Sequence, residues 1–89
     1  MTRIDRLVKL LDDPQVDTIL ANLFDRAVER DPDLDTEDPF EKMGVVIAEG
    51  LRLAYTLSKE IGVERTALLN NFNTIMSIED SKYKKSAMN

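Results

Sequence analysis

The sequence has 89 residues, of which 43% are hydrophobic and 33% are charged. This length fits one small domain with a thin core, and the composition excludes both a disordered chain and an integral membrane protein. His and Cys are both missing from the sequence. Their absence excludes disulfides, zinc sites built on either residue, haem ligation by either, thiolate nucleophiles and imidazole acid–base chemistry.

The negative charge is concentrated in one short segment. The chain has 12 basic and 17 acidic residues and a net charge of −5. Residues 31–41 carry six of these acids and no base, whereas the flanking segments are close to neutral. The acidity therefore describes one segment, and it argues only weakly against contact with nucleic acid.

The N-terminal residues 1–6 include three charges, so we expect no signal peptide there. The stretch with the fewest charges, residues 43–57, still contains Glu49 and Arg52 and falls short of the ~20 apolar residues that cross a bilayer. We expect a cytoplasmic protein that has no membrane partner.

Helical periodicity dominates the first third of the chain. Apolar residues recur at i, i+3, i+4 and i+7 from Ile4 to Leu11, which predicts a first amphipathic helix. Asp13 and Pro14 are typical of an N-cap and a first helical position, and they predict the start of a second helix. That helix should end at Asp31, because Pro32 disfavours the helical conformation of the residue before it.

The third helix has the clearest start signal. Asp38-Pro39-Phe40-Glu41 combines an N-cap, a proline at the first position and a Glu at the third, which predicts a capping box. We expect this helix to reach about Ile61 and to stop at Gly62. A fourth helix is predicted over about residues 63–76.

We therefore predict an all-α fold of four helices with a long third helix, packed as a small bundle. Residues 1–80 would form a single helical domain and residues 81–89 a flexible basic tail. The third helix is apolar on nearly all sides, more than its short neighbours can cover, which favours completion by a second copy of the chain. A central helix in a monomer is the alternative. The predicted oligomer interface consists of Met43, Gly44, Ile47, Ala48, Leu51, Ala54 and Tyr55.

The acidic segment supports only a weak metal hypothesis. The alternating carboxylates of Asp31, Asp33 and Asp35 resemble the opening of an EF-hand loop. However, Thr36 stands where that loop needs Gly, and Lys42 stands where it needs a bidentate Glu. We therefore predict no metal, no cofactor and no catalytic residue, and we interpret the segment as a binding loop for a basic protein surface. Its predicted contact residues are Asp31, Asp33, Asp35, Glu37 and Asp38.

Residues 57–72 are similar to a helix-turn-helix window. Apolar residues flank Gly62, and Val63 and Leu68 follow at the positions that such a motif requires. An ordinary helical hairpin needs the same residues and is the favoured interpretation. In the alternative, the fourth helix would read DNA, with Asn side chains suited to adenine and a basic end suited to phosphates. The DNA-binding set would be Arg65, Thr66, Asn70, Asn73, Lys82, Lys84 and Lys85.

The favoured function is a small non-enzymatic regulatory or adaptor protein. It would act through helix-mediated protein–protein contacts and the acidic loop, with itself and a basic protein surface as partners. The competing hypothesis is a dimeric helix-turn-helix transcriptional regulator.

Overall fold

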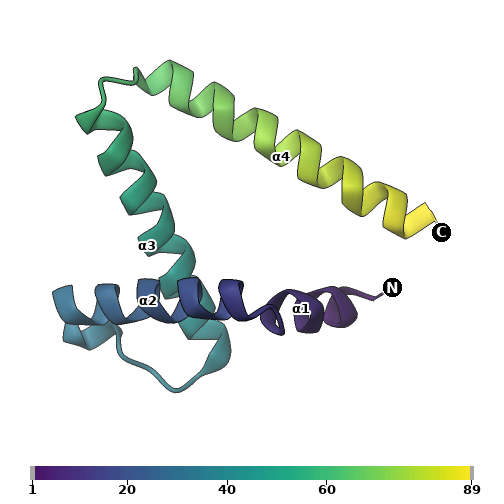
Figure 1. Cartoon of the computed structure of the whole chain (residues 1–89), viewed down its shortest axis with the longest axis horizontal. Coiled ribbons are helices and arrows are strands. Elements are labelled where there is room, and N and C mark those ends of the chain that lie inside the picture. Colours follow the sequence, from purple (N-terminus) through teal and green to yellow (C-terminus); the bar gives the residue numbers. More distant parts are fainter. Residues whose placement is uncertain (1, 89) are drawn as a thin grey trace. The chain divides into compact units, whose positions relative to one another are not determined.

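The computed structural model describes the backbone of residues 2–88 and the side chains of residues 2–82. Within this range the fold is all-α, which confirms the predicted fold class and the four α-helices (Figure 1). No strand occurs in residues 2–88. The elements in chain order are α1 (Arg3–Leu11), α2 (Pro14–Arg30), the 3-10 helix η1 (Pro32–Leu34), α3 (Pro39–Glu60) and α4 (Arg65–Met88).

The first two helices begin where short polar side chains satisfy their free N–H groups. Thr2 and Asp5 form a capping box before α1, each side chain accepting a hydrogen bond of 3.1 Å from the other residue's backbone N–H. Asp13 caps α2 as predicted, because its carboxylate accepts a hydrogen bond of 2.9 Å from the N–H of Gln15. The α1 capping box was not predicted from the sequence.

The start of α3 is as predicted, but its hydrogen bonding differs from a simple capping box. The Asp38 carboxylate accepts a hydrogen bond of 2.8 Å from the N–H of Phe40. The Glu41 side chain does not bond directly to the N–H of Asp38. Instead, that N–H donates to the hydroxyl of Thr36 at 3.2 Å, and the hydroxyl donates to the Glu41 carboxylate at 2.6 Å. Thr36 therefore connects the acidic loop to the first turn of α3.

Gly62 ends α3 in the way that the sequence indicates. Its φ of 81° is the only positive φ in residues 2–88, and this left-handed conformation favours glycine. The N–H of Val63 donates to the carbonyl of Ser58 at 2.8 Å, and the N–H of Gly62 donates to that of Lys59 at 3.1 Å. These two bonds form a Schellman motif, which satisfies carbonyl groups at the end of α3.

The fourth helix is longer than predicted. It begins at Arg65 and reaches Met88, whereas its predicted end was near Met76. The polar residues after Ile78 contain no Gly or Pro that would stop a helix. An ion pair of 3.0 Å between Lys82 and Glu79, one turn apart, also supports this part of α4. The predicted tail therefore lies in α4 up to Met88, and Asn89 lies outside the described residues.

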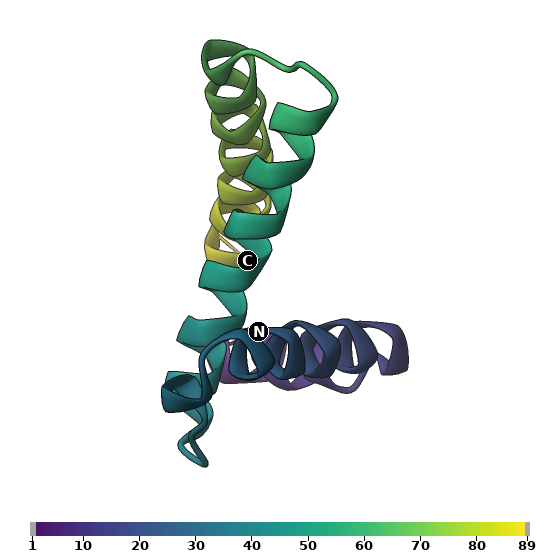
Figure 2. The same cartoon turned by 90° about the vertical axis from the view of Figure 1, so that its left-hand side faces the viewer.

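The chain divides into two compact units, which we call the N-terminal unit (Thr2–Ala54) and the C-terminal unit (Tyr55 onward). In the N-terminal unit α2 crosses the first half of α3, and the loop that contains η1 connects them (Figures 1 and 2). Ala27 of α2 is 1% exposed and Val46 of α3 is 9% exposed. No other apolar side chain in residues 2–82 is buried. In the same range, no helix is long and apolar enough to cross a membrane.

Candidate protein-binding site

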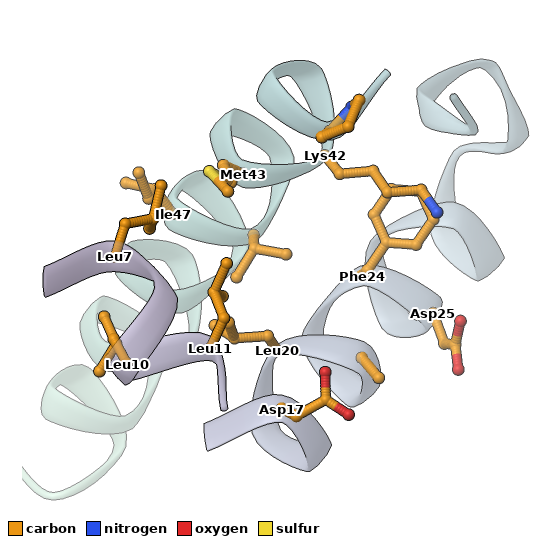
Figure 3. A pocket seen from close by; sticks show the side chains of 13 residues that line it. Leu7, Leu10, Leu11, Asp17, Leu20, Phe24, Asp25, Lys42, Met43 and Ile47 are labelled. Atoms are coloured by element: carbon orange, nitrogen blue, oxygen red, sulfur yellow. The ribbon is translucent and has the colours of Figure 1, made fainter. Parts of the chain in front are cut away.

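The N-terminal unit contains an open apolar groove of about 590 Å³, which we call the apolar groove. Three helices form it, because the leucines of α1, one side of α2 and the first turns of α3 face the same space (Figure 3). Ten of its thirteen lining residues are apolar. They are Leu7, Leu10 and Leu11 of α1, Leu20, Ala21 and Phe24 of α2, and Pro39, Met43, Val46 and Ile47 of α3.

Three charged residues border the apolar groove. Asp17 and Asp25 lie on α2, and both side chains are exposed (Figure 3). Lys42 lies on α3, where its ammonium group is 5.1 Å from the centre of the Phe24 ring. This cation–π contact joins α2 to α3 and occupies the one positive charge of the lining. The border of the groove is therefore acidic on the α2 side.

A buried carboxylate on α3 pairs with two arginines of α2 where these helices cross. The Glu49 carboxylate on α3 is only 2% exposed. It accepts hydrogen bonds from the Arg30 guanidinium, one of them at 2.9 Å, and it pairs with the guanidinium of Arg26 at 3.5 Å. Glu49 thus pairs with two arginines of α2, which lie 19 and 23 positions earlier in the chain.

A second cavity of about 420 Å³ lies where the loop and α2 meet α3. Gly44 and Ala48 line it together with half-buried Leu34 of η1. An added Cβ at Gly44 would meet no atom within 4 Å, so this glycine faces open space. The small side chains therefore leave α3 accessible at this level.

The predicted oligomer interface lies along α3 and is largely exposed. Ile47 is 64% exposed and Leu51 is 51% exposed. Gly44, Ala48, Ala54 and Tyr55 are also exposed, and Met43 is half-buried in the apolar groove. Tyr55 belongs to the C-terminal unit, whereas the other six residues belong to the N-terminal unit. Pairing with a second copy stays a prediction.

The predicted acidic binding residues divide into two groups. Asp31 and Asp38 use their carboxylates as N-caps, of η1 and α3 respectively. Asp33, Asp35 and Glu37 are exposed along the loop between them. Among residues 2–82, no three His, Cys, Asp or Glu side chains lie close enough together to hold a metal ion. The structure thus gives the loop local structural roles at its two ends and an acidic surface between them.

The predicted DNA-binding residues all lie on α4. Arg65, Thr66, Asn70, Asn73 and Lys82 are exposed, whereas the side chains of Lys84 and Lys85 lie outside those that the structure describes. Hydrogen bonding from the Arg65 side chain, and then the positive charges of Lys59 and Arg65, lower the pKa of the Tyr55 hydroxyl below its ordinary value of 10.0.

The expected apolar contacts of the helix-turn-helix window are incomplete. Leu57 and Ile61, which should lock the two helices of such a motif, are exposed. Val63 and Leu68 are half-buried. Ser58 is buried, and its hydroxyl donates to the carbonyl of Tyr55 at 2.7 Å. These residues form a capped turn between α3 and α4. DNA binding stays a prediction.

The apolar groove was not predicted from the sequence. The apolar positions of the first helix were interpreted as one amphipathic face, and those of the third helix were interpreted as an oligomer interface. Whether such stripes close into a core or border a groove depends on the helix crossing, which periodicity does not specify. No family model matches the sequence, and neither the curated proteins nor the solved structures compared with it give a significant match.

Proposed function

We propose that this protein is a non-enzymatic regulatory or adaptor protein that acts through helix-mediated protein–protein contacts. The observation that carries this proposal is the exposed apolar surface of α3. Ile47 and Leu51 lie one turn apart on that surface, and more than half of each side chain is accessible to solvent. Exposed apolar residues grouped in this way are typical of interaction sites, whereas single ones are common on any protein.

The spacing along α3 favours a second copy of the chain as one partner. Exposed positions alternate in steps of four and three residues, which is the heptad spacing of a coiled-coil seam. Gly44 lies in this series and leaves room for close approach of another helix. We call this series the α3 seam, and it consists of Phe40, Gly44, Ile47, Leu51 and Ala54.

The small core supports the same proposal. Ala27 and Val46 are the only buried apolar side chains among residues 2–82, and Ala27 contributes little area. A chain of this size needs most of its large apolar side chains covered to offset the loss of conformational entropy on folding. Association along the α3 seam would cover Ile47 and Leu51 and enlarge the core.

Sedimentation velocity on the full chain tests self-association. We expect a dimer that Leu51→Glu shifts to the monomer, because the substitution places a charge in the middle of the seam. The matched control is Ile19→Glu on α2, where the replaced side chain is 57% exposed and lies outside the seam. A monomer at every concentration, or equal effects of both substitutions, would contradict the proposed dimer.

The acidic loop is the second contact surface that we propose. Asp33, Asp35 and Glu37 are exposed, and Asp35 caps η1 only through its backbone N–H, which Asn also has. Replacing all three by Asn or Gln should therefore leave the helices intact. Binding to a basic protein surface should weaken, most strongly at low salt, because exposed charges act over about 10 Å at 0.1 M salt. Asp80→Asn on α4 gives a control for general charge. Unchanged affinity of the triple variant for a lysine-rich peptide would contradict this role.

The same protein preparation tests the competing prediction of DNA binding. Fluorescence anisotropy with labelled duplex DNA should show no sequence-dependent binding if protein contacts are the function. Binding that Arg65→Ala and Asn70→Ala abolish, with the oligomeric state unchanged, would instead support a helix-turn-helix regulator.

A further inference from the structure

We propose that the apolar groove of the N-terminal unit is the docking site for an amphipathic helix of a partner protein, with basic residues flanking its apolar stripe. This inference rests on the proposed function as a protein-binding module. It concerns a different surface from the α3 seam, because Ile47 alone belongs to both.

The dimensions of the groove fit a short helical segment. Its α2 side extends from Asp17 to Asp25, which corresponds to a length of about 12 Å at the rise of an α-helix. Two to three turns of a bound helix cover that length and present large side chains at i, i+4 and i+7. Leucines of α1 line the trough together with Met43 and Ile47 of α3, and Figure 3 shows Leu7 beside Ile47.

The chemistry of the lining favours an apolar helix face over a small polar ligand. Sites for small molecules combine an apolar wall with a few placed polar groups that orient the ligand. The lining of this groove contains no Ser, Thr, Asn, Gln or Tyr. Met43 has a flexible side chain that adapts to the shape of an incoming apolar surface. The lining of the groove therefore favours a ligand with large apolar side chains. The charged residues on its border must determine the orientation of that ligand.

The charges on the border identify the partner as basic. Asp17 and Asp25 are exposed on the α2 side, where the flank of a bound helix would lie. Lys42 is held over the Phe24 ring, so the opposite charge on the border already has a contact. The acidic loop leads directly into Pro39 at one end of the groove, and the N-terminal unit is acidic overall. Lys or Arg residues beside the apolar stripe would meet complementary charge.

Three designed peptides of about 14 residues, close to the shortest length that forms a helix in water, serve as probes. The first has Leu at i, i+4 and i+7 and Lys on its flanks, the second has the same Leu residues with Glu flanks, and the third keeps Lys but replaces each Leu by Ser. Anisotropy titrations against the full chain should show that the first peptide binds roughly tenfold more tightly than the second at low salt. The third peptide should not bind.

Charge reversal at the groove tests the assignment without removing apolar packing. In the double variant Asp17→Lys, Asp25→Lys, the preference should invert, so that the Glu-flanked peptide binds more tightly than the Lys-flanked one. The control is Glu60→Lys, Asp80→Lys, which makes the same change in net charge at exposed positions of the C-terminal unit. Met43→Ser, on the α3 side, should weaken the binding of both Leu-containing peptides. Circular dichroism verifies that each variant keeps its helices.

Other outcomes would overturn the proposal. Equal binding of both Leu-containing peptides that the double variant does not change would show that charge does not select the partner. If an apolar dye binds to the groove and neither Leu-containing peptide does, the groove would be assigned to a small molecule. The monomeric Leu51→Glu variant separates the two proposals. If the peptide binds only to the Leu51→Glu variant, a second copy of the chain occupies the groove. If the peptide binds to both the unaltered chain and the variant, a partner helix is supported, even if the unaltered chain is monomeric.

Discussion

The buried Glu49 of α3 and the partly exposed Arg30 of α2 form an ion pair across the helix crossing, with both carboxylate oxygens accepting hydrogen bonds from one guanidinium nitrogen. Glu49 is 2% exposed, so its charge depends on the arginines of α2 for compensation. The pair also specifies the register of the crossing, because Glu49 contacts Arg30 and Arg26, which lie one turn apart on one face of α2.

Removing Arg30 should therefore destabilise the N-terminal unit. We expect Arg30→Met to reduce the free energy of unfolding by about 1–2 kcal/mol, because Arg26 remains and Arg30 is itself partly exposed. The double variant Glu49→Met, Arg30→Met should recover most of this loss, since an apolar pair carries no desolvation cost. Urea unfolding followed by circular dichroism at one protein concentration measures both. Additive losses in the double variant would contradict the coupling.

The left-handed conformation of Gly62 predicts a cost for any side chain there. No atom lies within 4 Å of an added Cβ, so the Ala side chain would not clash. Gly62→Ala should therefore reduce the free energy of unfolding by about 1 kcal/mol through backbone strain alone. Gly50→Ala is the control, because this helical glycine would make only an ordinary contact of 3.9 Å with Leu23. Gly50→Ala should increase the free energy of unfolding by up to about 1 kcal/mol, measured by thermal or urea unfolding. Similar effects of both substitutions would count against the role assigned to Gly62.

The connection between Asp38, Thr36 and Glu41 predicts three graded effects on stability at the start of α3. Asp38→Ala should cost about 1 kcal/mol, because the N–H groups of Phe40 and Glu41 both lose their acceptor. Thr36→Val removes the hydroxyl that joins Asp38 to Glu41 and should cost less, since the cap itself remains. Asp38→Asn keeps an acceptor and should be the mildest change. Unfolding midpoints of the three variants would disagree with this interpretation if Thr36→Val were the most severe.

Tyr55 should ionise below the ordinary pKa of tyrosine. The hydrogen bond from Arg65 favours the phenolate, and the Lys59 and Arg65 charges add to this effect. A group whose native pKa is lowered contributes stability above its unfolded pKa of about 10, and this contribution is lost as the pH falls through the native pKa. A Tyr83→Phe background leaves Tyr55 as the titrating tyrosine in ultraviolet absorbance. There, Arg65→Ala should raise its pKa, and an unchanged titration would contradict the contact.

Local signals in the sequence predict most helix boundaries correctly. Asp13-Pro14, Asp38-Pro39 and Gly62 act within one turn of their own position, so the starts of α2 and α3 and the end of α3 agree with the structure to within one residue. The end of α4 is wrong because a polar composition was interpreted as the end of a helix. Without Gly or Pro, polar residues such as Glu79 and Lys82 extend a helix as readily as they end one.

The candidate site depends on features that lie far apart in the sequence. The apolar stripe of α3 was predicted as an interface, and the structure shows Ile47 and Leu51 exposed on it. The partners of Glu49 could not be predicted from spacing, because they lie on another helix whose crossing is a tertiary property. The apolar groove has the same origin, since α1, α2 and α3 form it only after they pack.

The acidic loop divides its carboxylates between two tasks. Asp31 and Asp38 hold backbone N–H groups at the two helix starts, and Glu41 accepts a hydrogen bond from Thr36. The carboxylates at positions 33, 35 and 37, which lie between them, are exposed and cap no helix start. Related sequences could therefore alter the electrical character of this loop without reshaping it, and selection could adjust partner preference while the scaffold stays constant.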